Sequence, residues 1–502
     1  SSVKISGNVY GGSRQENSQN LETTGVLTGK TNVNVSGTIS TNIYGGGYNA
    51  NVTEETNVKI SGTITGNIYG GSYQSYVGKK TNVIITGKIL GDIYGGGEST
   101  DNGIAGVGYV QNSQYISGET NIELQSGTIG NKNLQNNVYG GNKSNKIYET
   151  EKCQENTNIS IGKTGYNAPI IYSTIYGGGI NEKLNSTNIN IIDNARERYL
   201  TIYGASNEEC TILSTNININ GGFIANVYGS GRDKGNTDTT NITIAAGSIS
   251  NVYGAGDNNS SKKSNIIMNK GSVSNIYGGA NGASQNIEKT NVKLNGGDVS
   301  NVYGAGLNSG AIETNIEAKA TYVENIYGGS DTSGVVSKSN INVLSGNITN
   351  VYGGNLNGGY TIESNVNIQK TAQIRNDLFA GGKNSDIGSE NIRGKSTINI
   401  TGGSIYKDIN GGSYLGKVYG ETNVNIGKNA ATISSDKIEN DDIYILGDIF
   451  AGGTSEYSKY KNQYDNSQIS DYNFDKVTSV VGNSNIRIDG KTYVDFKNNI
   501  YG

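Results

Sequence analysis

Acidic side chains are the residues of this sequence with the most evident chemistry. Among 502 residues there are 43 Asp and Glu residues, no His and only two Cys. The absence of His excludes imidazole-based triads, most zinc enzymes and the usual neutral-pH proton shuttle. Two Cys are too few for a cysteine-built zinc or iron–sulfur site. Any catalysis would therefore depend on carboxylates, as it does in glycosidases.

Five acidic residues follow aromatic–glycine pairs in segments that have the composition of turns. They are Glu208, Glu209, Asp233, Asp257 and Asp331. Two of them on one face could cleave a glycan, but acids in turns are usually solvated, and the sequence has no Trp to serve as a sugar platform. A glycan lyase or hydrolase is the third functional hypothesis. We expect no enzyme, no catalytic residue, no cofactor and no metal site.

The elements that would position these acids are repeats. The motif Asn-(Ile/Val)-Tyr-Gly-Gly, seen at 42–46, recurs along the chain, and from Tyr203 to Phe379 its aromatic residue returns every 24 to 27 residues. Upstream of most copies lies (Thr/Ser)-Asn-(Ile/Val)-x-(Ile/Val/Leu), as at 31–35. Its alternation of apolar and polar residues is that of a half-buried strand. Gly, Asn, Thr and β-branched residues also disfavour helices.

A unit of about 25 residues with two or three short strands cannot bury its apolar face alone, but it can when it coils on its neighbours. We therefore predict an all-β fold, a single right-handed parallel β-helix (β-solenoid) over residues 1–502, with about 17 coils of about 25 residues. Insertions break the period at 13–30, 98–119, 142–156 and 454–482.

Two rows of side chains are expected to pass from coil to coil. The Asn of the first strand is a candidate ladder of hydrogen-bonded amides. Its members include Asn32, Asn57, Asn82, Asn216, Asn241 and Asn291. In the second motif, alternation places Ile43 inward and Tyr44 outward, which predicts an exposed aromatic stripe that calls for a partner; burial of Tyr in the core, with Gly making room, is the alternative. The stripe comprises Tyr44, Tyr69, Tyr94, Tyr228, Tyr253, Tyr277, Tyr303, Tyr327 and Tyr352.

The two cysteines and the longest insertion leave alternatives open. Cys153 and Cys210 occupy the same turn in coils that are two apart, which separates them by roughly 10 Å. This distance exceeds the usual reach of a disulfide unless a loop bends. A disulfide bridge and two free thiols therefore both remain as alternatives. The insertion at 454–482 combines aromatic and polar residues, which suits a wet binding surface or a flap packed on its own coil. Its aromatic residues are Tyr457, Tyr460, Tyr464, Tyr472 and Phe474.

Charge and hydropathy exclude two classes of partner. With 39 basic and 43 acidic residues the net charge is −4, so no overall basic field attracts nucleic acid or anionic lipid. No run of 18 apolar residues occurs, so we expect no membrane-spanning helix.

The repeats, for example TNVKISGTITGNIYGGS at 56–72, resemble the Gly- and Asn-rich repeat regions of bacterial β-solenoid surface proteins, the adhesin and surface-fibre class. The resemblance covers almost the whole chain and lies in the pattern rather than in a diagnostic motif. It implies an extracellular or cell-surface location and a structural or adhesive role.

Recognisable repeat strands lie at both ends of the sequence, in residues 1–12 and 485–502. An uncovered coil exposes unpaired backbone groups, so either the chain is part of a longer solenoid or its ends stack on other copies. A head-to-tail contact does not close and builds a filament. The leading hypothesis is a subunit of an extracellular bacterial filament that polymerises by β-stacking. The alternative is an adhesin stalk that binds glycan or a host protein through the Tyr-rich insertions.

Overall fold

A computed structural model describes most of the chain. The described residues are 5–15, 26–99, 106–111, 114–133, 136–144, 155–194, 200–282, 286–427, 442–454, 480–489, 494–496 and 499–501. They form strands and no helix, and successive strands pair in parallel, so the predicted all-β parallel solenoid is confirmed. The chain divides into two compact units, residues 1–250 with 255–261, and residues 251–254 with 262–502.

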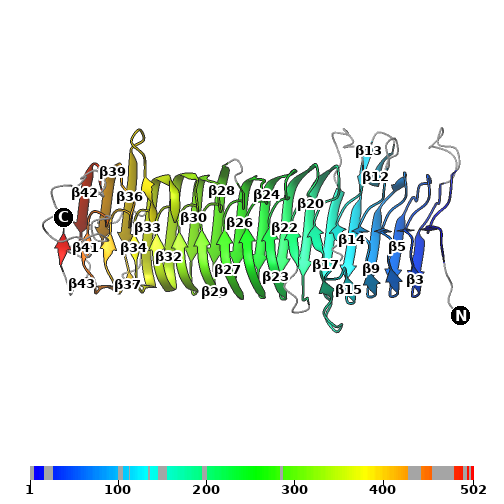
Figure 1. The fold of residues 1–502 in the computed structure, drawn as a ribbon, viewed down its shortest axis with the longest axis horizontal. Helices are drawn as coiled ribbons and strands as arrows, with labels where there is room; N and C mark the ends of the chain where they lie inside the picture. Colours follow the sequence, from blue (N-terminus) through cyan, green and yellow to red (C-terminus); the bar gives the residue numbers. More distant parts are fainter. Residues whose placement is uncertain are drawn as a thin grey trace. The chain divides into compact units, whose positions relative to one another are not determined.

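In the first unit each coil contributes up to three strands, and equivalent strands of successive coils lie side by side (Figure 1). The first strands of the coils are β2 (Thr31–Val35), β5 (Glu55–Ile60), β9 (Lys80–Ile85), β14 (Glu119–Leu124), β17 (Glu155–Ile161), β20 (Glu182–Ile191), β22 (Cys210–Ile219) and β24 (Gly235–Ile244). The short middle strands are β3 (Thr38–Ile39), β6 (Thr63–Ile64), β10 (Lys88–Ile89), β15 (Thr128–Ile129) and β18 (Ile170–Ile171). The third strands are β1 (Val9–Tyr10), β4 (Ile43–Tyr44), β7 (Ile68–Tyr69), β11 (Ile93–Tyr94), β16 (Asn137–Tyr139), β19 (Thr174–Tyr176), β21 (Thr201–Tyr203) and β23 (Phe223–Tyr228).

The insertion at 98–119 adds a small side sheet to this unit. Strand β12 (Gly106–Gln111) pairs antiparallel with β13 (Gln114–Ser117) and parallel with β8 (Tyr76–Val77).

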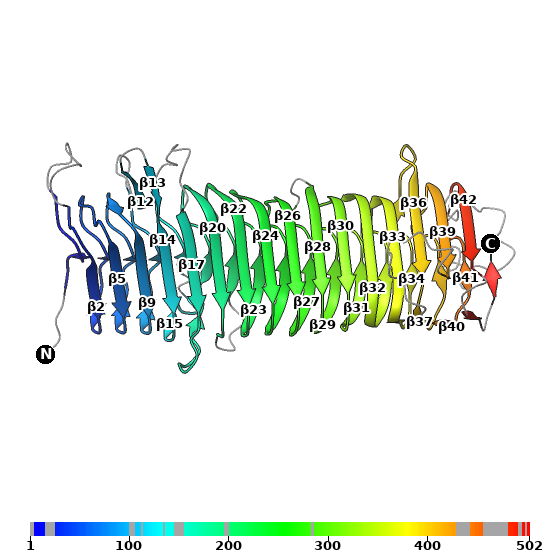
Figure 2. The same cartoon turned by 180° about the vertical axis from the view of Figure 1, so that it is seen from behind.

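The second unit repeats the arrangement with longer strands, as the view from behind also shows (Figure 2). Its first strands are β26 (Ser261–Met268), β28 (Ile287–Leu294), β30 (Ala311–Ala318), β36 (Gly394–Ile400), β39 (Gly420–Ile426) and β42 (Asn483–Ile488). Its other strands are β27 (Ser272–Tyr277), β29 (Asp298–Tyr303), β31 (Tyr322–Tyr327), β34 (Leu378–Phe379), β35 (Asn384–Ile387), β37 (Gly403–Ile405), β38 (Ile409–Asn410), β40 (Ile443–Ile445), β41 (Ile449–Phe450), β43 (Val494–Phe496) and β44 (Ile500–Tyr501). Strands β32 (Val335–Tyr352) and β33 (Asn357–Ile374) continue through the corner, and β25 (Ser248–Tyr253) spans the division between the units.

Register is fixed by identical residues facing each other. Strand β5 sets Asn57 opposite Asn82 and Ile60 opposite Ile85 of β9, and in the second unit β28 sets Asn291 opposite Asn315 of β30. The inward-facing aliphatic residues of these strands are fully buried. A slip of one residue would turn them to the outer face, so the apolar columns define the register.

The glycine turn and the first strand are joined across each coil. The buried hydroxyl of Thr56 donates to the carbonyl oxygen of Gly70 at 2.5 Å, and Thr290 donates in the same way to Gly304 at 2.5 Å. A Cβ atom added to Gly70 would lie 2.2 Å from the carbonyl oxygen of Gly95 in the next coil. The close approach of backbones explains why this motif position is Gly.

Candidate functional site

The tyrosines of the second motif form one row of stacked rings in each unit. Neighbouring ring centroids lie between 4.6 Å, for Tyr203 and Tyr228, and 5.6 Å, for Tyr352 and Phe379. The row in the first unit comprises Tyr10, Tyr44, Tyr69, Tyr94, Tyr139, Tyr176, Tyr203 and Tyr228. The row in the second unit comprises Tyr253, Tyr277, Tyr303, Tyr327, Tyr352 and Phe379.

The expectation of an exposed stripe is wrong. The rings predicted to form it are buried, with exposed fractions from 0% for Tyr69 to 6% for Tyr228 and Tyr253. The cover comes from the arm, the segment that follows each glycine turn (residues 47–54 in one coil, 72–79 in the next). Tyr73 of the arm packs its ring edge-on against Tyr44, with centroids 5.7 Å apart. The tyrosine row is therefore a second buried layer and no open docking surface.

Three of the tyrosine hydroxyls, those of Tyr44, Tyr203 and Tyr277, donate to carboxylates carried by arms two coils further along. Tyr44 donates to Glu98 at 2.5 Å, and Tyr277 donates to Asp331 at 3.1 Å. Burial raises the pKa of Tyr44 and Tyr277, and that of Tyr327 to about 12. It also raises the pKa of Asp331, which accepts hydrogen bonds from two tyrosines of the row. These contacts fasten the arms over the stack.

Glu98 links the row to a basic side chain. Its carboxylate also accepts a hydrogen bond from the Lys143 amine at 2.9 Å, with the pair mostly shielded from water. The same amine lies 3.4 Å from the hydroxyl of Tyr69 and 5.9 Å from the ring centroid of Tyr94. A charge-assisted hydrogen bond of this kind is stronger than one between neutral groups.

The Asn side chains of the first strand are hydrogen-bonded from coil to coil. Asn82 donates its amide to Asn57 at 2.9 Å, and Asn121 donates to Asn82 at 3.2 Å. Further links join Asn216 to Asn188, Asn241 to Asn216, and Asn291 to Asn265. At the N-terminal end of this row the side-chain amide of Asn57 donates to the backbone carbonyl oxygen of Thr31 rather than to the side chain of Asn32. Asn32 faces Asn57 in the register.

A second Asn row lies beside the tyrosines, and the sequence reasoning missed it. Asn325 donates to Asn301 at 2.9 Å, and Asn350 donates to Asn325 at 2.8 Å. The signal was present in the sequence, because these Asn residues are the first residue of each Asn-(Ile/Val)-Tyr motif. The acidic partners of the tyrosines share a position as well, because Glu98, Asp257 and Asp331 each lie four residues after the motif Tyr of their own coil. The sequence did not show that this position reaches a tyrosine two coils away.

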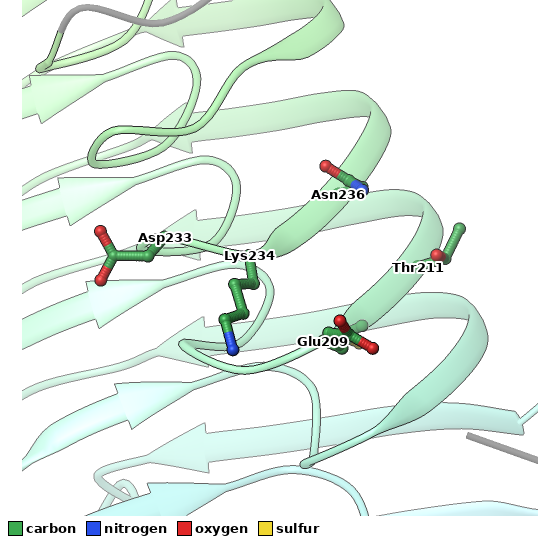
Figure 3. A pocket seen from close by; sticks show the side chains of 6 residues that line it. Glu209, Thr211, Asp233, Lys234 and Asn236 are labelled. Atoms are coloured by element: carbon green, nitrogen blue, oxygen red, sulfur yellow. The ribbon is translucent and has the colours of Figure 1, made fainter. Parts of the chain in front are cut away.

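The five candidate acids do not converge on one site. Glu209 and Asp233 line the same groove, of about 400 Å³, together with Cys210, Thr211, Lys234 and Asn236. Figure 3 shows Lys234 between Glu209 and Asp233, with the Asp233 carboxylate directed away from Glu209. The Lys234 amine lies 3.7 Å from Glu208.

Two of the candidate acids belong to the tyrosine rows. Asp257 accepts a hydrogen bond from the hydroxyl of Tyr203 at 3.3 Å, and Asp331 accepts one from Tyr277. Their carboxylates fasten arms to the stack.

Cys210 is a buried free thiol that packs with Leu184, Ala205 and Ile212. Burial raises its pKa. Cys153 lies outside the described residues, as do the aromatic side chains Tyr457, Tyr460, Tyr464, Tyr472 and Phe474.

Two searches of the part of the chain that the structure describes, for a metal-binding cluster and for a membrane-spanning helix, find neither. No group of three or more Cys, Asp or Glu side chains there could hold a metal ion, and no helix there is long and apolar enough to cross a bilayer. Comparisons with protein-family models, curated proteins and solved structures find no match to this chain.

Proposed function

We propose that this chain is a structural subunit of an extracellular bacterial filament that grows when the end coil of one copy stacks on the first coil of the next. The observation that carries the proposal is the shared register of the coil contacts within each unit. In most coils Asn faces Asn, Thr faces Thr, and Tyr faces Tyr. The coil at 394–410 departs from this pattern, with Thr397 in the Asn row and Asn410 at the Tyr position. The extracellular location is supported by the resemblance of the repeats to bacterial surface solenoids.

The coil contact is directional, and its two faces are complementary. Asn82 donates to Asn57 on one side and accepts from Asn121 on the other. A contact that joins two different faces can be repeated indefinitely without closing. The same contact can therefore be made between chains.

In two coils, those of β2 and β42, one edge of the first strand has no paired strand among the described residues. Strand β2 pairs there only with β5, and β42 pairs only with β39. Ile500 and Tyr501 are 47% and 49% exposed, whereas the equivalent Ile449 is fully buried. Strand β1 likewise pairs only with β4, and β44 only with β41, within the described residues. A second copy that places β1 on β44 would set Tyr10 against Tyr501.

Electron microscopy and sedimentation velocity test the proposal, with two variants of matched exposure. Tyr501→Asp places a charge on the proposed contact face, and Tyr322→Asp, at 47% exposure, places one on the side of the solenoid. We expect the wild-type chain and the Tyr322 variant to form filaments that lengthen with concentration, and the Tyr501 variant to stay monomeric. A wild-type chain that remains monomeric, or a Tyr501 variant that assembles normally, contradicts the proposal.

The adhesin alternative depends on the insertion at 454–482, whose aromatic residues lie outside the described part of the chain. It stays a prediction. The enzyme alternative would need carboxylates aimed at one point, and Glu209 and Asp233 are not so arranged (Figure 3).

A further inference from the structure

Glu182, the first residue of β20, has a buried carboxyl group that joins two glycine turns. Its Oε1 atom accepts hydrogen bonds from the backbone N–H of Asn142 at 2.9 Å and from the Asn142 side-chain amide at 2.6 Å. Its Oε2 atom accepts from the backbone N–H of Gly179 at 2.8 Å. Asn142 belongs to the preceding coil and Gly179 to the same coil as Glu182, so the carboxyl group connects the coils.

In some other coils a neutral side chain performs this task, whereas in others the position is also Gly, as at 256 and 306. The Asn142 side-chain oxygen accepts from the N–H of Gly97 at 2.8 Å, and the Asn355 oxygen accepts from the N–H of Ser330 at 2.9 Å. In the coil that contains Glu182 the equivalent position is Gly179, which has no side chain. Glu182 therefore reaches back three residues to supply the missing acceptor.

The space around the carboxyl group is shaped for it. A Cβ atom added to Gly141 would lie 1.9 Å from Oε2 of Glu182, and one added to Gly179 would lie 2.3 Å from it. Only glycine at these two positions leaves room for the carboxyl group, so the position of Glu182 depends on both glycine turns.

No cation balances the charge of this group among the described residues packed against it. In the preceding coil the Lys143 amine is bound to Glu98. In the following coil Cys210 faces Glu182 in the register, and its thiol is the titratable group on that side. The charged neighbours along the two strands, Lys183 and Glu209, have exposed side chains.

We propose that Glu182 is a proton-controlled clasp, which holds the two turns together while its carboxyl group is protonated and loosens them when it ionises. A buried carboxylate without a counter-ion is costly, and the three N–H donors offset only part of that cost. Burial raises the pKa of Glu182 to about 7, so the change falls in the neutral range. The clasp would set the stability of the turn at which the 142–156 insertion begins.

The sign of the effect follows from linkage. In the closed turn the pKa is about 7, whereas the ordinary value that applies when the turn opens to water is 4.5. The closed form therefore binds the proton more tightly, its stabilisation is complete below pH 4.5, and it is lost as the pH rises to about 7. Above that pH the opening equilibrium no longer depends on this group.

Hydrogen exchange measured by mass spectrometry from pH 5 to pH 8.5 on the full chain tests the clasp. We expect the protection of peptides that contain the Asn142 and Gly179 amides, corrected for intrinsic exchange, to fall at least tenfold between pH 5 and about pH 7 and then to level. The amide of Ser330 is the internal control, because its acceptor Asn355 does not titrate, and its protection should stay constant.

The variant Glu182→Gln removes the titration and should make the protection of both turns independent of pH. Constant protection in the wild-type chain, protection that rises with pH, or an unchanged pH dependence in the variant would each overturn the proposal. If the variant does not fold, the comparison of the Asn142 and Ser330 amides within the wild-type chain decides alone.

Discussion

The stacked tyrosine row predicts that a ring removed from its middle destabilises several coils. Tyr303 is 4% exposed and stacks on Tyr277 at 4.7 Å and on Tyr327 at 5.1 Å. Tyr303→Ala leaves a cavity the size of an aromatic ring and breaks both stacking contacts, so we expect a loss of about 3–5 kcal/mol. Tyr303→Phe keeps the ring and loses only the hydrogen bond to Asp331, which amounts to about 1.5 kcal/mol.

Native-state hydrogen exchange is the suitable assay, because a solenoid of repeated coils need not unfold in one step. The free energies of opening of β27, β29 and β31 should all fall in the Ala variant, since each coil is stabilised by its neighbours. Tyr322→Ala, at 47% exposure, is the control and should change these values by about 0.5 kcal/mol or less. A loss below about 1 kcal/mol for Tyr303→Ala, or one confined to β29, would refute the reasoning.

Three further predictions concern the glycine turn and the tyrosine hydroxyls. Thr290→Val removes the buried donor to the Gly304 carbonyl and should lower the free energy of opening of β28, measured by native-state hydrogen exchange, by about 1–3 kcal/mol. Gly278→Ala places a Cβ atom 2.1 Å from the same carbonyl oxygen and should cost about 3 kcal/mol or more, whereas Gly37→Ala meets no atom within 4 Å and should change stability by about 1 kcal/mol or less. Because burial raises the pKa of Tyr327 from 10.0 to about 12, the folded chain holds this proton more tightly than the unfolded chain. Its contribution to stability should be constant below pH 10 and be lost as the pH rises toward 12; a urea midpoint that does not fall in this range would contradict it.

The repeat itself made the solenoid predictable. Alternation in 31–35 and its copies identifies the first strand, and the fixed spacing to the Ile-Tyr pair sets equivalent residues opposite each other in successive coils. The same reasoning placed Asn57 and Asn82 in one row, where the structure shows their side chains hydrogen-bonded.

The position of the tyrosines could not be read from alternation alone. Alternation correctly places the side chains of Ile43 and Tyr44 on opposite sides of their strand. It does not reveal that an arm covers the outer side. The covering residues, such as Tyr73 and Glu98, lie in segments with little sequence in common. Glu182 was missed for a related reason, because its role depends on how closely the turns at Asn142 and Gly179 approach it, which the repeat pattern does not show.

Cryo-electron microscopy of the assembled material tests the central claim most directly. The account predicts filaments in which strands about 4.8 Å apart continue across the junction between copies, with β44 of one copy paired in parallel with β1 of the next. Single particles of one chain length at every concentration, or filaments in which copies contact through their sides, would contradict it.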